Sequence, residues 1–254
     1  MLIPGFLNHK LLFQSLATDG FAIVPSFIAP NEVRALSDAF DRLVCLSRTF
    51  QGTTDWQGSR FVIDADPFRI HRVVWCGGAE PAIGRFGDDP RFVEVAAAAL
   101  GARPVVQIIQ QAHFKLPGDE VAFAWHQDAS NRRYGTDQFF DVNGRGSFIQ
   151  TALAIDGTGP ENGGLSFVAG SHRLGFVANP VTGALPEGLV DPARIVAPKL
   201  HPGDLILFGP FVIHGSEPNR SAQPRRLFLQ GYTLSGANHR VYQGCGTGVL
   251  RNGS

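Results

Sequence analysis

The run DLILFGPFVIHG, residues 204–215, decides the fold class of this sequence. It is a short apolar segment interrupted by Gly and Pro, and a polar turn separates it from a second apolar run, RRLFLQGYTL (225–234). Earlier runs of the same kind are PVVQIIQQAHFKL (104–116), FAWHQD (123–128), SFIQTALAID (147–156) and GLSFVAG (164–170). Several short strand signals at this spacing predict a mainly β protein, either a sandwich or a barrel.

Helical patterns lie mostly in the first hundred residues. The segment APNEVRALSDAFDRLVCLSR (29–48) repeats apolar residues at a 3.6-residue period, with Asn31 as a candidate cap. A second helix is predicted over 90–100, because Asp89 precedes a proline at its first position and Gly101 follows its end.

The segment over 55–85 mixes Gly, Asp, Arg and aromatic residues without a period. We expect it to form an irregular flank or lid over one end of the barrel. The sequence thus predicts a single domain over 1–254, with a mainly helical flank over 1–104 and a barrel core over 105–235.

The amino-acid composition limits the kinds of molecule that the protein is expected to bind. Lys and Arg together number 22, as do Asp and Glu, so no net charge attracts nucleic acid or an anionic membrane. The three cysteines form no CxxC pattern, and there is no secretion signal and no apolar run of eighteen residues. We therefore expect a cytoplasmic protein that acts on a small molecule.

The residues AWHQDAS (124–130) contain a candidate metal site. On a strand, residues two apart share a face, so His126 and Asp128 can both point into a barrel. Two histidines and a carboxylate leave positions open on a metal, which suits non-haem Fe(II). The candidates for the third metal ligand are His113, His172, His201 and His214. Of these, His214 is favoured because it ends a buried apolar run, where an imidazole needs a partner.

The strand that follows strengthens this choice. Arg225 or Arg226 is expected to run antiparallel beside the His214 strand, and alternation lets only one of the two point inward. A buried guanidinium is costly unless it meets an anion, and its fork matches a carboxylate. A metal with open positions and an inward arginine together describe a site for a dicarboxylate.

The sequence resembles the phytanoyl-CoA dioxygenase family of Fe(II)- and 2-oxoglutarate-dependent oxygenases. The likeness is carried by DGFAIVPSFI (19–28), KLPGDEVAFAWHQD (115–128), ALAIDGTGPENGGLSFVAGSHRLG (152–175) and HPGDLILFGPFVIHGSEPNRSAQPRR (201–226). The resemblance implies a double-stranded β-helix, the jelly-roll or cupin-like core, with flanking N-terminal helices. It also implies Fe(II) as cofactor, with 2-oxoglutarate and O2 as co-substrates.

By position, the resemblance implies that His126, Asp128 and His214 bind the iron. It implies that Arg225, eleven residues after His214, pairs with the far carboxylate of 2-oxoglutarate. Ser216 would hydrogen-bond the same carboxylate, and Gln111 would be a further co-substrate contact. Because the metal carboxylate is present, the expected reaction is hydroxylation of a C–H bond, with release of succinate and CO2.

The loop after the metal motif, ASNRRYGTDQFFDVNGRG (129–146), supplies candidate substrate contacts. These are Arg132, Arg133, Tyr134 and, on the next strand, Gln150; the resemblance adds Arg72. The loop arginines are equally compatible with surface ion pairs. Two rival functions stay open: a metal-dependent cupin-type enzyme that does not use 2-oxoglutarate, and a non-catalytic barrel that binds a small ligand.

Overall fold

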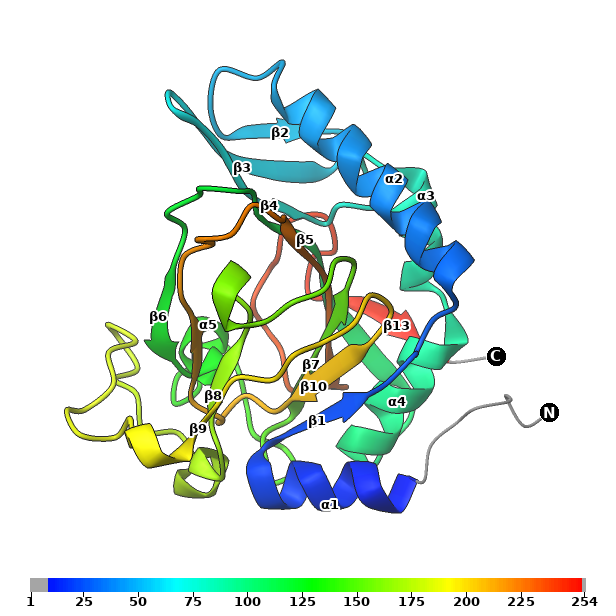
Figure 1. Cartoon of the computed structure of the whole chain (residues 1–254). Coiled ribbons are helices and arrows are strands. Elements are labelled where there is room, and N and C mark those ends of the chain that lie inside the picture. Colours follow the sequence, from blue (N-terminus) through cyan, green and yellow to red (C-terminus); the bar gives the residue numbers. More distant parts are fainter. Residues whose placement is uncertain (1–8, 253–254) are drawn as a thin grey trace.

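The computed structural model describes residues 9–252, in which two β-sheets face each other and helices cover the outer side of the larger one (Figure 1). Within that range the larger sheet has the order β1-β10-β7-β12-β5-β4-β3-β2, and β13 also pairs with β5. The smaller sheet has the order β6-β11-β8-β9. The mainly β, jelly-roll fold predicted from the sequence is confirmed.

The strands are β1 Phe21–Val24, β2 Thr54–Trp56, β3 Ser59–Ala65, β4 Phe68–Val74, β5 Val105–Lys115, β6 Phe123–His126, β7 Phe148–Ala154, β8 Ser166–Val168, β9 Ile195–Val196, β10 Leu205–Phe208, β11 His214–Ser216, β12 Arg225–Leu234 and β13 Val249–Arg251. The α-helices are α1 His9–Asp19, α2 Pro30–Ser47, α3 Pro81–Gly84, α4 Pro90–Leu100 and α5 Asp128–Arg132. Short 3-10 helices lie at Arg85–Gly87, Pro160–Asn162, Ser171–Leu174 and Pro192–Arg194.

The run over 204–215 belongs to both sheets. Its first half is β10, which pairs with β1 and β7 in the larger sheet. Its second half contains β11, which pairs with β6 and β8 in the smaller sheet. Gly209 and Pro210 separate the two halves, and Pro210 has no N–H with which to continue a ladder. The break carries His214 across to the sheet that also holds His126.

One prediction about strand neighbours is wrong. Arg225 and Arg226 lie on β12, which pairs with β5 and β7 in the larger sheet and not with the His214 strand. The polar turn between β11 and β12 therefore returns the chain to the larger sheet, so His214 and Arg225 belong to opposite sheets.

The helix predicted over 90–100 is confirmed as α4. Asp89 caps it by accepting a hydrogen bond from the Arg91 amide at 2.9 Å, and Gly101 ends it with φ +71°. The helix predicted over 29–48 is α2, but its cap is wrong: Ala29 is the N-cap and Asn31 lies inside the first turn. The Glu32 carboxylate accepts the Ala29 N–H at 2.8 Å, so a residue of the helix itself binds a terminal amide.

The segment over 55–85 is not irregular, which corrects the sequence-based expectation. It consists mainly of β2, β3 and β4, which form antiparallel hairpins and extend the larger sheet beyond β5. Its strand signals are obscured because the inner faces of these strands carry arginines. Figure 1 shows β2 and β3 at one end of the molecule, beside α2.

The core lies between the helices and the outer face of the larger sheet. Phe40 of α2 packs on Phe114 of β5 with ring centroids 5.3 Å apart, and Phe92 of α4 contacts Phe228 of β12 at 6.1 Å. Because successive strand residues alternate, the residues next to Phe114 and Phe228 point to the other, inner face. That inner face carries a second, smaller group of buried apolar residues, among them Leu227 and Phe208, together with polar side chains.

Arg226 fastens β12 to α2. Its guanidinium is buried and donates to both carboxylate oxygens of Asp156 at 2.8 Å, to Asp41 of α2 at 2.7 Å and to the Ser37 hydroxyl at 2.8 Å. Asp156 also accepts the Arg226 backbone N–H at 2.9 Å. The Asp156 side chain is 18% exposed, whereas that of Asp41 is 66% exposed.

The two carboxylates should therefore differ in their contribution to stability. We expect Asp156→Ala to lower the free energy of unfolding by about 3 kcal/mol, because it leaves a buried guanidinium short of a partner. Asp41→Ala should cost below about 1 kcal/mol, since that pair is exposed. Urea denaturation measures both, and equal losses would refute the assignment of Asp156 as the main partner.

Candidate metal and co-substrate site

A cavity of about 370 Å³ opens between the two sheets. Residues of both sheets line it, together with α5 and the segment that follows β12. The smaller sheet contributes His126 and His214, and the larger sheet contributes Gln111, Gln150 and Arg225. Such a cleft, with apolar walls and a few convergent polar groups, is the usual form of a small-molecule site.

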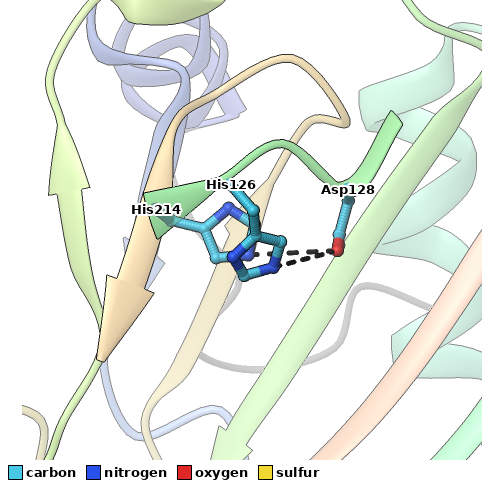
Figure 2. Close-up of side chains that lie close together, drawn as sticks. All are labelled: His126, Asp128 and His214. Atoms are coloured by element: carbon cyan, nitrogen blue, oxygen red, sulfur yellow. Dashed lines mark ion pairs between the residues drawn. The ribbon is translucent and has the colours of Figure 1, made fainter. Parts of the chain in front are cut away.

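The side chains of His126, Asp128 and His214 converge in this cavity (Figure 2). Their ligand atoms all lie within 4.8 Å of one another. Each histidine turns its Nε2 toward the same Asp128 oxygen, at 3.8 Å from His126 and 4.0 Å from His214. The two rings come from paired positions on β6 and β11, with centroids 4.3 Å apart.

Asp128 does not lie on the strand, which corrects the sequence argument. The strand β6 ends at His126, and Asp128 is the first residue of α5 after Gln127 as its N-cap. The turn into the helix, and not the alternation of a strand, brings the carboxylate back toward the histidines. The spacing of His126 and Asp128 correctly indicated that the two side chains meet, but strand alternation was the wrong explanation for it.

Hydrogen bonds to main-chain carbonyls hold both imidazoles. His126 Nδ1 lies 2.7 Å from the Ala124 oxygen and His214 Nδ1 lies 3.1 Å from the Val212 oxygen. A carbonyl only accepts, so each Nδ1 carries the hydrogen and each Nε2 presents its lone pair to the cavity. Metal-binding histidines are typically oriented in this way.

The charge states also suit a metal. Burial, followed by the neighbouring His126, lowers the pKa of His214 to about 4, so its imidazole is neutral at pH 7. Burial raises the pKa of Asp128, but the electrostatic interactions of its carboxylate with His214, Arg132 and His126 outweigh burial, and the net pKa lies below the ordinary value. Neutral imidazoles and a carboxylate are the forms that bind Fe(II), so the residues present fit that ion.

The remaining histidine candidates lie elsewhere or bond differently. His113 lines the cavity, but its Nε2 lies 2.8 Å from Gln111 Oε1. Burial, then the charges of Arg72 and Arg225, lowers its pKa well below the ordinary value. His172 contacts the Ala17 carbonyl at 3.2 Å, far from the site in the chain, and is not part of the metal-ligand group.

Gln127, between the two ligands in sequence, was not singled out from the sequence. Its side chain is completely buried. The amide nitrogen donates to Gly175 O at 2.8 Å and Phe211 O at 2.6 Å, and the oxygen accepts from Val177 N at 2.9 Å and Ala178 N at 3.1 Å. It therefore ties the metal motif to two other chain segments.

Removing this side chain should loosen the metal motif. Gln127→Ala leaves four main-chain groups without their partner, so we expect a loss of about 3 kcal/mol or more in the free energy of unfolding. We also expect metal affinity to fall about tenfold, because the ligands on either side lose their support. Urea denaturation and competition with a metal chelator measure the two effects. The exposed Gln138→Ala is the control, and an unchanged metal affinity in Gln127→Ala would contradict this role.

Arg225 and Lys115 form the second part of the site. They are paired across β12 and β5, and their side chains are 2% and 0% exposed. Burial lowers the pKa of Arg225 to about 9, and burial together with Arg225 lowers the pKa of Lys115 to about 7. No carboxylate among residues 9–252 forms an ion pair with either. Two adjacent buried cations without a counter-ion indicate a place for an anion.

Short polar contacts fix these cations. Arg225 Nε donates to Gly163 O at 3.1 Å, and Lys115 Nζ donates to Ser216 Oγ at 2.7 Å and to Glu217 O at 2.5 Å. Gly163 has φ +75°, and a Cβ there would clash with Glu217 O and with the Lys115 side chain. Lys115 was not identified from the sequence, although alternation along β5 from Gln111 places it on the inner face.

The predicted substrate contacts divide into two groups. Arg72, Arg132 and Gln150 line the cavity. Tyr134 does not line it: this residue is 3% exposed and packs against Phe139 with ring centroids 4.5 Å apart. Arg133 also lies outside, with its side chain near the main-chain carbonyls of Pro180 and Val181.

Comparison with known proteins agrees with this arrangement. The family model for phytanoyl-CoA dioxygenase (PhyH) matches residues 16–227, most of the chain and all three metal-ligand candidates. The chain belongs to the phytanoyl-CoA dioxygenase family. Arg225 and Ser216 also fall within the matched residues of this PhyH protein.

Relatives of this PhyH protein include a methylphosphonate hydroxylase of Gimesia maris, 28% identical over 54% of this chain and 48% of the relative. An ectoine dioxygenase of Halomonas elongata is 25% identical over 81% of this chain and 64% of the relative. The chain thus spans about half to two thirds of the length of these curated relatives. The crystal structure of EctD from S. alaskensis with bound Fe has a TM-score of 0.72 at 21% identity, covering 92% of this chain and 79% of that one.

Within residues 9–252 of the PhyH protein, none of the helices has the length and apolar composition that crossing a bilayer requires.

Proposed function

We propose that the chain is an Fe(II)- and 2-oxoglutarate-dependent dioxygenase that hydroxylates an unactivated C–H bond of a small molecule. The reaction would consume O2 and release succinate and CO2. The observation that carries the proposal is the pair of buried, unneutralised cations, Arg225 and Lys115, beside the cavity that holds the His126, Asp128 and His214 cluster.

The three metal-ligand candidates would bind the iron through two Nε2 atoms and one carboxylate. Iron bound in this way supplies open coordination positions at which a 2-oxo acid and O2 are activated together. The main-chain carbonyls on both Nδ1 atoms keep the imidazoles in the binding tautomer, and Gln127 keeps the strand-to-helix turn in place. The protein thus contributes the orientation of the ligands.

The far carboxylate of 2-oxoglutarate would bind to Arg225. Its planar fork matches a carboxylate, and its desolvation is offset when an anion arrives. Because the Ser216 oxygen accepts a hydrogen bond from Lys115, the Ser216 hydroxyl hydrogen is free to be donated to the same carboxylate. Gln111, which lines the cavity on β5, would be a further contact.

The two rival functions differ from this proposal in what they require. A cupin-type enzyme that does not use 2-oxoglutarate needs the metal cluster but has no use for Arg225 and Lys115, which are costly to bury. A non-catalytic barrel needs neither the cations nor a converging set of metal ligands. The proposed dioxygenase function is the one of the three that uses both the two buried cations and the converging metal ligands.

The substrate would be a small molecule. The cavity of about 370 Å³ must hold 2-oxoglutarate and the substrate together, which favours a small substrate over a long acyl chain carried by coenzyme A. The relatives named for methylphosphonate and ectoine also carry the names of small substrates. We further propose a cytoplasmic location, because Cys45, Cys76 and Cys245 are all free thiols.

The first test needs no substrate. Fe(II) and 2-oxoglutarate added together without oxygen should produce the weak visible charge-transfer absorption of a chelated 2-oxo acid. His214→Ala should abolish the band and lower iron affinity strongly, because it removes one of three ligands. Absence of both the band and bound iron in the wild-type protein would refute the proposal.

A second pair of variants tests the co-substrate end. Arg225→Ala should bind iron but lose 2-oxoglutarate affinity at least about a hundredfold, in keeping with the roughly 3 kcal/mol that charge-assisted hydrogen bonds contribute. Arg226→Lys, which changes the neighbouring outward guanidinium, should bind 2-oxoglutarate almost as the wild type does. Equal binding by all three proteins would favour the cupin-type alternative.

Binding of 2-oxoglutarate should also take up a proton. Burial and Arg225 lower the pKa of Lys115 to about 7, against a smaller opposing effect of Glu217, so most of this lysine is neutral at pH 8. A dianion bound nearby raises that pKa, because it stabilises the ammonium form. Affinity should therefore fall as the pH rises above 7.

Calorimetry at pH 8 in buffers of different ionisation enthalpy measures this proton. We expect close to one proton per 2-oxoglutarate in the wild type and in Lys199→Met, whose lysine is exposed. Lys115→Met should take up none. Equal uptake in both variants would show that another group titrates.

A further inference from the structure

Arginines dominate the charged lining of the cavity. Arg60, Arg72, Arg132, Arg225 and Arg240 line it, whereas Asp128 is the one carboxylate among the lining residues. The chain as a whole has equal numbers of basic and acidic residues, so this excess is local. A cleft lined by one sign of charge concentrates ligands of the opposite sign.

Two of these arginines are accounted for. Arg225 lies at the proposed co-substrate end, and Arg60 forms an exposed ion pair with Asp55 at 3.6 Å. Three then remain, Arg72, Arg132 and Arg240, and none has a carboxylate within 4.0 Å in the described part of the chain.

Arg72 is the least satisfied of the three. It lies on β4, opposite His113 of β5, and burial lowers its pKa below the ordinary value. Among the described residues its guanidinium has no hydrogen-bond or ion-pair partner, although it lines the cavity. The cross-strand neighbour His113 supplies no negative charge in either of its protonation states, so it does not compensate the charge of Arg72. A half-buried guanidinium in this state lacks an anion.

Arg132 and Arg240 form a second basic group around Tyr242. Their guanidinium carbons lie 5.4 and 5.1 Å from the centre of the Tyr242 ring. Arg132 is 6% exposed and donates to the Tyr242 hydroxyl at 2.9 Å, while its Nε is buried without a partner. Arg240 donates to the Asn131 carbonyl at 2.6 Å. These contacts orient both cations but neutralise neither.

We propose that the substrate of this enzyme carries an anionic group, a phosphonate, phosphate or carboxylate, which Arg72 binds and which Arg132 and Arg240 attract. This inference rests on the proposed dioxygenase function, since it concerns the substrate of the same site. Apolar side chains, including Ile109, Leu229 and Phe208, complete the lining. The substrate is thus a small molecule with an anionic end and a carbon skeleton that reaches the metal cluster.

The charge pattern disfavours the opposite class of substrate. An amine without a compensating acid would meet three like charges and find Asp128 already engaged as a metal ligand. A neutral substrate would leave Arg72 desolvated and unpaired, which costs free energy on binding.

The test uses small probes of matched size. The protein is loaded with Fe(II) and 2-oxoglutarate without oxygen, and the charge-transfer band reports that the co-substrate is bound. Calorimetric titration then compares methylphosphonate, acetate, acetamide and methylammonium. We expect the two anions to bind and the neutral and cationic probes not to bind; the ratio of the two anion affinities distinguishes a phosphonate or phosphate from a carboxylate.

The variants locate the anion. Arg72→Gln should weaken binding of the preferred anion at least tenfold, with the charge-transfer band intact, and Arg240→Gln should weaken it several-fold. Arg133→Gln changes an arginine outside the cavity and should have no effect. Arg72 is half-exposed, so its replacement should leave folding unaffected.

Three outcomes overturn the proposal. One is that neither methylphosphonate nor acetate binds more tightly than acetamide, and another is anion binding that is as strong in Arg72→Gln as in Arg133→Gln. The third is loss of the charge-transfer band in Arg72→Gln, which would assign Arg72 to 2-oxoglutarate. If the wild-type protein gives no band, the dioxygenase function fails; titration of the probes without 2-oxoglutarate then decides the anion site separately.

Discussion

The alternation of side chains along β12 is the constraint on which the rest of the structure depends. Because of this alternation, the adjacent residues Arg225 and Arg226 point to opposite faces of the larger sheet. Arg226 meets Asp156 and the helix α2 on the outer face, where its charge is balanced within the protein. Arg225 lies on the inner face, where no carboxylate of the described chain forms an ion pair with it. A shift of one residue in register would exchange an anchor of the fold and a group of the site.

The energetics of the two faces differ accordingly. The outer face has apolar packing and a network of satisfied hydrogen bonds, both of which favour folding. The inner face carries Arg225, Lys115 and Arg72, all with lowered pKa values because burial opposes their charge. Proteins retain unfavourable groups of this kind at functional sites, and here the arrival of an anion would relieve the cost.

Much of the fold could be predicted from local patterns. Each apolar run contained a strand, and Asp89 and Gly101 marked the ends of α4, because periodicity and caps depend on neighbours in sequence. The metal-ligand candidates were found because His214 ends a buried run and His126 precedes Asp128 by two residues. The pairing of strands could not be found in this way. It depends on contacts between distant segments, and so β12 was placed beside the wrong strand and the hairpins over 55–85 were missed.

The surroundings of individual side chains were the second aspect of the structure that could not be predicted from the sequence. Tyr134 was expected in the cavity because it lies in a polar loop, but it packs against Phe139 once the loop folds back. Gln127 has four main-chain partners, three of which lie about fifty residues away in sequence and one more than eighty. Lys115 could have been identified by counting alternate positions from Gln111 along β5. That Arg225 lies directly opposite Lys115, however, follows only from the register of β12.

Two of the three unpaired arginines, Arg72 and Arg240, lie on elements that carry no metal-ligand candidate, whereas Arg132 shares α5 with Asp128. His126, His214 and Arg225 come from β6, β11 and β12, whereas Arg72 lies on the β2–β4 extension and Arg240 follows β12. Replacements in the extension and in the segment after β12 can therefore accumulate without disturbing the three metal-ligand candidates. Residues that would contact the substrate can thus differ between relatives while the metal-ligand candidates stay the same. A family of this kind can therefore diverge in substrate through changes at the edges of its fold.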